Sequence, residues 1–275
     1  MTTERIEIEE PSQAMLREAR KLLRRKERRA SGAFLVEGRQ AVREAIRTPG
    51  VVQHVFVRWG SAHENLDLVE EARTAGIPVY AVSEQNLATM SDTVTPQGIV
   101  AVARFVDVGL DEALHRPDKD VSLVVICAEI RDPGNAGTVI RCADAFGADA
   151  VILSSDSVEA YNPKVVRASV GSLFHLPIVT GVDLATAIEA CRTAGLQVLA
   201  TDGEAGNDLT DLGDDLAKPT AWVMGNEAWG LPSESLALAD ASVAVPIYGH
   251  AESLNLATAA AICLYASAST QRSQR

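Results

Sequence analysis

Short apolar strands alternate with helical segments through the second half of the chain, and this alternation constrains the fold more than any other feature. The run at 121–130, VSLVVICAEI, is almost continuously apolar, as is typical of a strand buried on both faces of a parallel sheet. Further strands are expected at 150–154, 196–201, 220–224 and 242–247. Helices are expected near 136–147, 163–171, 184–194, 233–239 and 254–268. The pattern predicts a mostly parallel sheet covered by helices, with a ligand site at the carboxyl ends of its strands.

The first half of the chain predicts a second, smaller α/β domain. A basic helix is expected over about 12–29, and further helices at 39–47 and 64–75. Strands are expected at 34–37, 52–57, 78–82 and 99–105. The length of 275 residues fits two domains. We therefore expect an N-terminal domain over 1–107, a polar linker over 108–120 and a C-terminal domain over 121–275.

The charge of the chain is unevenly distributed. The net charge is −12, which alone argues against a nucleic-acid partner. Residues 16–47, however, hold eleven lysines and arginines against four acidic residues. A basic segment on an acidic body is typical of a polyanion-binding end, although a solvated helix face would give the same pattern.

Several classes of protein are disfavoured by the sequence. No apolar run reaches the length of a membrane span, and the acidic N-terminus does not resemble a signal peptide. The four cysteines are scattered and no histidine lies near them at metal-ligand spacing, so we expect no metal. Neither a GxGxxG dinucleotide motif nor a P-loop is present. The sequence predicts a cytoplasmic protein without a membrane association.

Three loops rich in glycine and polar residues follow three of the predicted strands. The first contains Asn135 and leads towards Arg141, the second contains Glu227 between two glycines, and the third contains Ser253 and Asn255. We expect Ser253 to cap the final helix and Asn255 to point back to the cleft. Each loop alone fits an ordinary turn, but together they predict a functional site. For Trp229, in the second loop, the sequence leaves both substrate contact and burial open.

These loops carry a family resemblance. Their motifs are Asn135-x-Gly137-x-x-x-Arg141, then GNEAWGL at 225–231, then PIYGHAESLN at 246–255. In this order and spacing, they resemble those of the SpoU (TrmH-type) RNA ribose 2′-O-methyltransferases of the SPOUT superfamily. The resemblance covers about 121–270. It implies an α/β trefoil-knot methyltransferase domain, S-adenosylmethionine as cofactor and a homodimer, with an N-terminal RNA-binding domain similar to a ribosomal protein.

The resemblance also assigns residues to roles. The implied catalytic group is Arg141, Asn135, Glu227, Ser253 and Asn255. The implied cofactor-binding residues are Leu199, Ala200, Thr201, Gly225, Asn226, Val245, Pro246, Ile247 and Leu254. From the charge pattern, the expected RNA-binding residues are Arg24, Arg25, Arg28, Arg39, Lys164 and Arg167. In the family, the arginine at the position of Arg141 is sometimes assigned as the general base. A guanidinium stays protonated in proteins, so we favour a different role for Arg141, which is to bind the neighbouring phosphate and to stabilise the developing alkoxide.

The expected function is therefore 2′-O-methylation of a ribose in RNA. We expect 23S ribosomal RNA as substrate, for ribosome maturation or for antibiotic resistance, because the related tRNA enzymes often lack an N-terminal domain of this kind. A tRNA methyltransferase is the first alternative. The second is a catalytically idle RNA-binding or ribosome-assembly factor on the same scaffold, although degenerate members lose the arginine or the Ser-Leu-Asn stretch and this chain keeps both.

Overall fold

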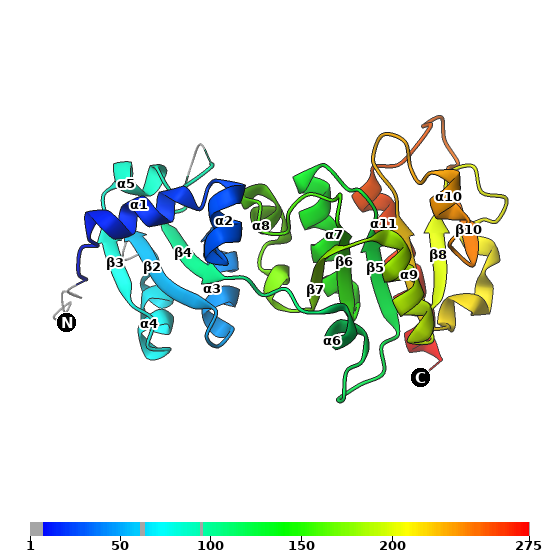
Figure 1. Ribbon diagram of the computed structural model, residues 1–275, viewed down its shortest axis with the longest axis horizontal. Helices are drawn as coiled ribbons and strands as arrows, with labels where there is room; N and C mark the ends of the chain where they lie inside the picture. The colour runs from blue at the N-terminus through cyan, green and yellow to red at the C-terminus, as the bar shows by residue number, and fades with distance from the viewer. Residues whose placement is uncertain (1–7, 61–63, 94–95, 275) are drawn as a thin grey trace. The chain divides into compact units, whose positions relative to one another are not determined.

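The computed structural model describes residues 8–60, 64–93 and 96–274. The chain forms two compact units (Figure 1). One comprises Met1–Val106 with Tyr161–Phe174, and the other Asp107–Ala160 with His175–Arg275. We call them the N-terminal unit and the C-terminal unit. In the described residues, no helix has the length and apolarity needed to cross a membrane, and no cluster of His, Cys, Asp and Glu could hold a metal.

The N-terminal unit is built on a four-stranded sheet. Its order is β1-β4-β2-β3, in which β2 and β3 are parallel and the other pairs antiparallel. The strands are β1 (Ala33–Glu37), β2 (Val52–Arg58), β3 (Val79–Val82) and β4 (Ile99–Arg104). The helices are α1 (Gln13–Lys21), α2 (Arg25–Ser31), α3 (Arg39–Arg47), α4 (Leu66–Thr74) and α5 (Glu84–Ala88). Leucines of α1 and α5 pack on the sheet, and the predicted α/β layer domain is present.

The basic segment forms two helices, so the expectation of one helix over 12–29 is wrong. The chain turns at residues 22–24, between α1 and α2. Arg28 in α2 is only 2% exposed, and its Nη1 donates to the carbonyl oxygens of Leu22 and Leu23, both at 2.9 Å. These bonds satisfy carbonyls at the end of α1 that have no partner within the helix. Arg28 is therefore a structural residue, and we withdraw it from the RNA-binding set.

Replacing Arg28 with methionine is expected to lower the free energy of unfolding of the N-terminal unit by about 1–3 kcal/mol, because buried carbonyls lose their donor. Urea unfolding followed by circular dichroism would measure the change. Arg24→Met is the matched control, since Arg24 is exposed and its loss should change stability by about 0.5 kcal/mol or less. Equal stability of the two variants would contradict the structural role.

The C-terminal unit contains a six-stranded sheet with the order β10-β8-β9-β5-β6-β7, in which every pair is parallel. Its strands are β5 (Leu123–Cys127), β6 (Ala150–Ser154), β7 (Ile178–Val182), β8 (Gln197–Thr201), β9 (Thr220–Met224) and β10 (Ala241–Val243). Strand β7 was not predicted from the sequence. Its helices are α6 (Leu110–Leu114), α7 (Pro133–Phe146), α9 (Leu184–Thr193), α10 (Ser233–Leu236) and α11 (Leu256–Ser273).

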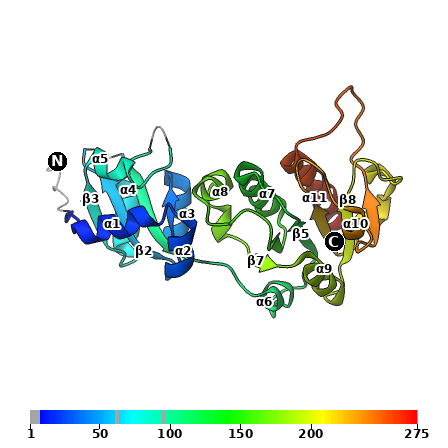
Figure 2. The same cartoon turned by 45° about the horizontal axis from the view of Figure 1, so that its top comes forward.

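Helices cover both faces of this sheet. Helices α7 and α11 pack against each other and against β5 on one face, while α6 and α9 lie together on the other (Figure 2). Helix α6 falls within 108–120, the stretch expected to be a linker. Ala113 and Leu114 of α6 are buried in the core cluster beside Ile188 of α9. Part of this polar stretch therefore belongs to the fold of the C-terminal unit.

The segment Tyr161–Phe174 packs with the N-terminal unit, although the sequence analysis assigned it to the domain over 121–275. The ring of Tyr161 stacks on Phe105, with centroids 3.8 Å apart, and lies 4.6 Å from Phe34 in β1. Its hydroxyl accepts a hydrogen bond from the Val106 amide at 2.8 Å. This aromatic cluster attaches helix α8 (Pro163–Ser169), with Lys164 and Arg167, to the N-terminal unit.

The cysteines of the native protein are expected to resist alkylation. Burial raises the pKa of Cys191 and of Cys263 to about 12. Burial also raises the pKa of Cys127, with a smaller contribution from the charge of Glu227. Burial also raises the pKa of Cys142, and Arg141 partly opposes this. Because the thiolate is the reactive form, a raised pKa leaves these thiols protonated and slow at pH 8. Iodoacetamide with mass spectrometry should label few thiols in native protein and all four after denaturation. Rapid labelling of Cys191 or Cys263 without denaturant would contradict this burial.

Candidate active site

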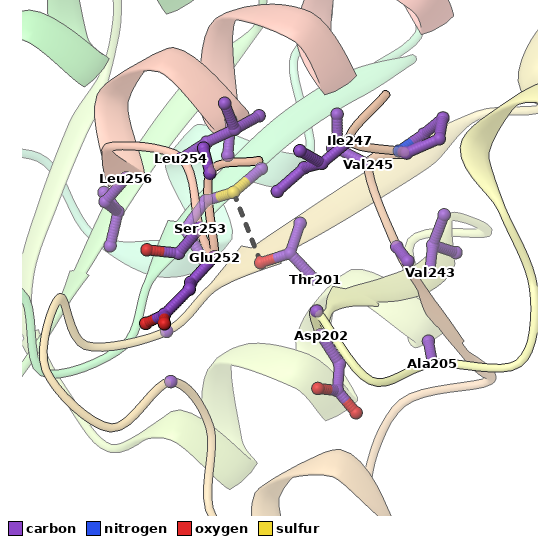
Figure 3. Close-up of a pocket in the computed structure, with 18 of the residues that line it drawn as sticks. Thr201, Asp202, Ala205, Val243, Val245, Ile247, Glu252, Ser253, Leu254 and Leu256 are labelled. Atoms are coloured by element: carbon purple, nitrogen blue, oxygen red, sulfur yellow. Dashed lines mark hydrogen bonds between the residues drawn. The ribbon is translucent and has the colours of Figure 1, made fainter. Parts of the chain in front are cut away.

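A cavity of about 770 Å³ lies beyond the carboxyl ends of β8, β9 and β10 (Figure 3). Seven of the nine predicted cofactor-binding residues line it. They are Thr201, Gly225, Asn226, Val245, Pro246, Ile247 and Leu254. The other two, Leu199 and Ala200, are buried within β8 and do not line the cavity. The backbone of strand ends and loops therefore surrounds a space with apolar walls, which is the usual form of a small-molecule site.

Gly225 closes the turn after β9. A Cβ atom at this position would lie 2.5 Å from the carbonyl carbon and 2.7 Å from the carbonyl oxygen of Gly230. Two backbone hydrogen bonds hold the two ends of this loop together, since the amides of Asn226 and Gly230 each donate to the other's carbonyl at 2.9 Å. The side-chain amide of Asn226 also donates to the Glu129 carbonyl at 2.7 Å. The loop at 225–230 is thus a tight structure joined to the loop after β5.

Glu227 connects the loops further. Its carboxylate accepts hydrogen bonds from the backbone amides of Arg131, at 3.3 Å, and Asp132, at 3.2 Å. It also accepts one from the side-chain amide of Asn135 at 3.2 Å. The side-chain oxygen of Asn135 in turn accepts from the side-chain amide of Asn255 at 2.9 Å. One chain of side chains, Asn255–Asn135–Glu227, therefore joins all three motif loops.

The start of the final helix differs from the expectation. Asn255, and not Ser253, is the N-cap residue of α11, because its side-chain oxygen accepts from the amides of Ala257, at 2.9 Å, and Thr258, at 3.3 Å. Its side-chain nitrogen remains available for Asn135. Asn255 thus both caps the helix and joins the network, while Ser253 lines the cavity.

The cavity is strongly acidic. Four carboxylates line it, from Asp202, Asp208, Glu227 and Glu252. Figure 3 shows Asp202 and Glu252 on two different loops around the pocket. Of the residues that the structure describes, no lysine or arginine is among its lining residues. This electrostatic environment favours a ligand that carries positive charge. The sequence analysis did not single out Asp202 or Glu252, because an acid at a strand end is common in any acidic chain.

Arg141 lies on α7 with an exposed side chain and does not line the cavity. Within the described part of the chain, its guanidinium has neither an ion pair nor a hydrogen bond. Asn135 stands in the first turn of the same helix, whose start is capped by Asp132 through a 2.8 Å hydrogen bond to the Asn135 amide. The structure thus joins Asn135, Glu227 and Asn255 directly, and leaves Arg141 available to a partner from outside the chain.

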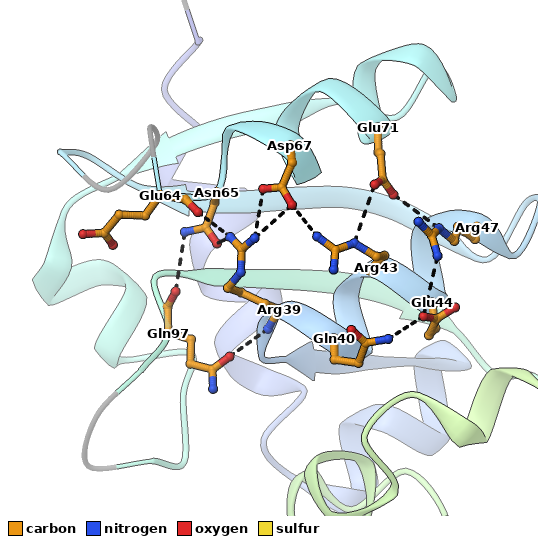
Figure 4. A network of polar contacts seen from close by, with 10 residues as sticks. All are labelled: Arg39, Gln40, Arg43, Glu44, Arg47, Glu64, Asn65, Asp67, Glu71 and Gln97. Carbon is orange, nitrogen blue, oxygen red and sulfur yellow. Dashed lines mark hydrogen bonds and ion pairs between the residues drawn. The ribbon is translucent and has the colours of Figure 1, made fainter. Parts of the chain in front are cut away.

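Much of the predicted RNA-binding charge is neutralised inside the N-terminal unit. Arg39 contacts Asp67 at 2.9 Å and Asn65 at 2.7 Å (Figure 4). Burial raises the pKa of Asp67, but the hydrogen bond and the positive charge of Arg39 hold this pKa below its usual value. Arg43 contacts the same carboxylate. One face of α3 is therefore paired with α4.

The remaining candidates differ in exposure. Arg24, Arg25 and Lys164 are exposed. Arg167 lies 3.5 Å from both Glu37 and Asp92, and its side chain is only 25% exposed. Exposed arginines and lysines therefore remain along α1, α2 and α8.

Comparison with known proteins identifies the family. Residues 122–265 match the model of the SpoU rRNA Methylase family. The chain belongs to this family. In this SpoU methylase, residues 14–101 also match the MRM3-like substrate binding domain. The chain is 33% identical over 262 residues to the 23S rRNA (guanosine(2553)-2'-O)-methyltransferase RlmP of Bacillus subtilis, covering 94% of this chain and 98% of that protein.

Solved structures give the same result. The SpoU methyltransferase AviRb from Streptomyces viridochromogenes superposes with a TM-score of 0.80 at 32% identity, over 95% of this chain and 99% of that one. The AdoMet-bound rRNA methyltransferase from Sinorhizobium meliloti superposes with a TM-score of 0.76 at 29% identity, over 94% and 96% of the two chains. The expected family, fold class and cofactor, S-adenosylmethionine, are confirmed.

Proposed function

We propose that this SpoU methylase transfers a methyl group from S-adenosylmethionine to a ribose 2′-hydroxyl of 23S ribosomal RNA. The observation that carries the proposal is the Asn255–Asn135–Glu227 network, which joins the three loops beside an acidic cavity. The names of the relatives support the substrate, since RlmP is a 23S rRNA methyltransferase. The match to a substrate binding domain at 14–101 supports an RNA-contacting role for the N-terminal unit.

The cavity fits S-adenosylmethionine. Its volume of about 770 Å³ falls within the range of small-molecule sites. The backbone at Gly225 and Val245–Ile247 offers donors and acceptors for an adenine, and Leu254 offers an apolar wall. The carboxylates of Asp202 and Glu252 suit a positively charged ligand. When bound, S-adenosylmethionine supplies an electrophilic methyl group on a positively charged sulfur.

The residues of the chain would orient the ribose and stabilise charge. The 2′-oxygen gains negative charge as its proton passes to solvent water. A guanidinium that stays protonated can stabilise this oxygen and hold the neighbouring phosphate. We assign this role to Arg141. Asn135 would order the loop against which the ribose hydroxyl binds, since both the nitrogen and the oxygen of its side-chain amide are hydrogen-bonded. Glu227 and Asn255 would hold Asn135, and Ser253 would complete the cavity wall.

The resemblance also supports a trefoil knot, a homodimer and a cytoplasmic location. After β10, at one edge of the sheet, the chain returns to pack α11 against α7 and β5, as a knotted segment requires. For the dimer contact we propose the α7–α11 face, where Tyr265 is 60% exposed and its ring lies 5.6 Å from that of Phe146. A cytoplasmic location follows from ribosomal RNA as the proposed substrate.

The proposal is tested by methyl transfer from radiolabelled S-adenosylmethionine to unmodified 23S rRNA, 16S rRNA and tRNA. Label in 23S rRNA alone is the expected result. Label in tRNA alone would replace the proposed substrate with tRNA. If neither naked RNA nor ribosomal subunits are labelled and the cofactor does not bind, the chain is a catalytically idle member of the family.

A further inference from the structure

Trp229 is an exposed aromatic side chain beside the proposed active site. It is 51% exposed and lies in the loop at 225–230, two residues after Glu227. The buried Trp222 of β9 provides a contrast, because it is fully covered and its indole N–H donates to the Ser267 hydroxyl at 2.9 Å. Core packing therefore does not explain Trp229, whose large apolar surface remains in contact with water.

Arg131, from the loop after β5, lies over this ring. Its guanidinium carbon is 4.9 Å from the ring centroid, which is within the range of a cation–π contact. The Arg131 side chain is 64% exposed, and its Nη2 lies 3.8 Å from a Glu129 carboxylate oxygen. The pair therefore combines an aromatic face with a positive charge on two different loops.

Both loops hold the pair in place through bonds that do not involve either side chain. The Arg131 amide donates to Glu227 at 3.3 Å, and the Asn226 side chain accepts from the Ala228 amide at 2.8 Å. The Asn226–Gly230 backbone pair closes the loop around Trp229. We call the Trp229–Arg131 pair the platform. Because its backbone is already held by hydrogen bonds, the platform can bind a ligand with little loss of its own conformational entropy.

The pair lies outside the cofactor cavity. Ala228 and Gly230, on either side of Trp229, line the cavity, whereas Trp229 and Arg131 do not. Glu227 lines the cavity and also accepts the Arg131 amide. The platform is thus separated from the cavity by a single loop, and it faces solvent.

We propose that Trp229 and Arg131 form a binding site for an unpaired nucleobase of the RNA substrate, next to the reacting ribose. This inference rests on the proposed function and names the part of the RNA that the C-terminal unit recognises. Unpaired bases bind proteins by stacking on aromatic side chains and on arginine, and each stacked base contributes substantially to affinity. The exposed ring provides the stacking surface, and the guanidinium provides a positive charge for the base edge or a phosphate.

The first test is steady-state kinetics of Trp229→Leu, which keeps an apolar side chain but removes the aromatic ring. The KM for RNA should rise about 10-fold or more, as expected for the loss of one stacked base, while the dissociation constant of S-adenosylmethionine stays unchanged. Trp229→Phe should restore most of the affinity. Leu238→Ala is the matched control, since Leu238 is an exposed apolar residue of the same unit that does not line the cavity.

The second test observes the ring directly. The chain has three tryptophans, so Trp59→Phe leaves only the buried Trp222 and the exposed Trp229. A single-stranded oligoadenylate, whose unpaired bases can stack on the exposed ring, should quench the long-wavelength emission of Trp229, and Arg131→Ala should weaken the binding of that RNA. This test retains Trp229 itself, so it holds even if Trp229→Leu folds poorly.

The outcomes separate this proposal from the proposed function. If wild-type protein methylates RNA, but Trp229→Leu leaves KM within twofold and the fluorescence does not change, the base-binding site is refuted and the function stands. A weaker affinity for S-adenosylmethionine in Trp229→Leu, without a change in RNA affinity, would refute it as well, because the ring would then only support the Glu227 loop. Quenching by RNA without methylation of any RNA would support the base-binding site and refute the function.

Discussion

Arg141→Ala should lower kcat for methyl transfer by about 10²- to 10³-fold, the usual cost of removing one group that stabilises a developing oxyanion. The cofactor affinity should not change, because Arg141 does not line the cavity. The fold should also remain intact, since the side chain is exposed and makes no hydrogen bond within the described part of the chain. Steady-state methyl transfer at saturating RNA, with calorimetric titration of S-adenosylmethionine, would measure both quantities.

Arg141→Lys distinguishes the possible roles of the guanidinium. Lysine keeps the charge but loses the planar fork that binds a phosphate through two hydrogen bonds. We expect Arg141→Lys to remain closer to the alanine variant than to wild type. Near-normal turnover of the lysine variant would show that a point charge suffices and would refute the bidentate phosphate anchor.

The order of strands and helices in the C-terminal unit was largely predictable from the sequence. The run at 121–130 became β5, in which every residue is buried, because a strand covered on both faces must be apolar throughout. Strand β7 (Ile178–Val182) was missed. It lies at the sheet edge, contains an exposed Gly181, and only its first two residues are buried, so the apolar signal is short.

The charge pattern of the sequence predicted the RNA-binding surface of the N-terminal unit less well, because ion pairs between distant segments depend on the tertiary structure. The sequence places Arg39 in a basic cluster, but it does not show that the acidic residues of α4 lie against α3. The same holds for Arg28, whose burial depends on a turn between α1 and α2 that contains neither glycine nor proline. The net charge of a segment therefore overstated the surface available to RNA.

The candidate site was predicted through its motifs rather than its geometry. The position of Asn135, Glu227 and Asn255 in three loops after parallel strands implied proximity, and the hydrogen bonds bear this proximity out. The choice between Ser253 and Asn255 as helix cap was not decided by residue type, since both are good N-caps. The catalytic and cofactor roles of these residues stay predictions.

Gly225→Ala should abolish detectable binding of S-adenosylmethionine and, with it, methyl transfer. The new methyl carbon would lie 2.5 Å from the Gly230 carbonyl carbon and 2.8 Å from the Leu231 nitrogen. Those atoms are backbone, so the turn itself must open. Opening it separates Asn226 from Gly230 and moves Glu227 away from the Asp132 amide, so that the cavity wall and the three-loop network are lost together.

Gly203→Ala provides the matched control for this prediction. Gly203 lines the same cavity, but a Cβ there meets no atom within 4 Å. Its φ angle lies outside the left-handed region, so alanine fits without strain. Calorimetric titration should show near-wild-type cofactor affinity for Gly203→Ala and none for Gly225→Ala, with cooperative thermal unfolding in both. Tight cofactor binding by Gly225→Ala would mean that the close approach of residues 225 and 230 does not shape the cavity. The loop after β10 would then have to form the part of the wall that binds the cofactor.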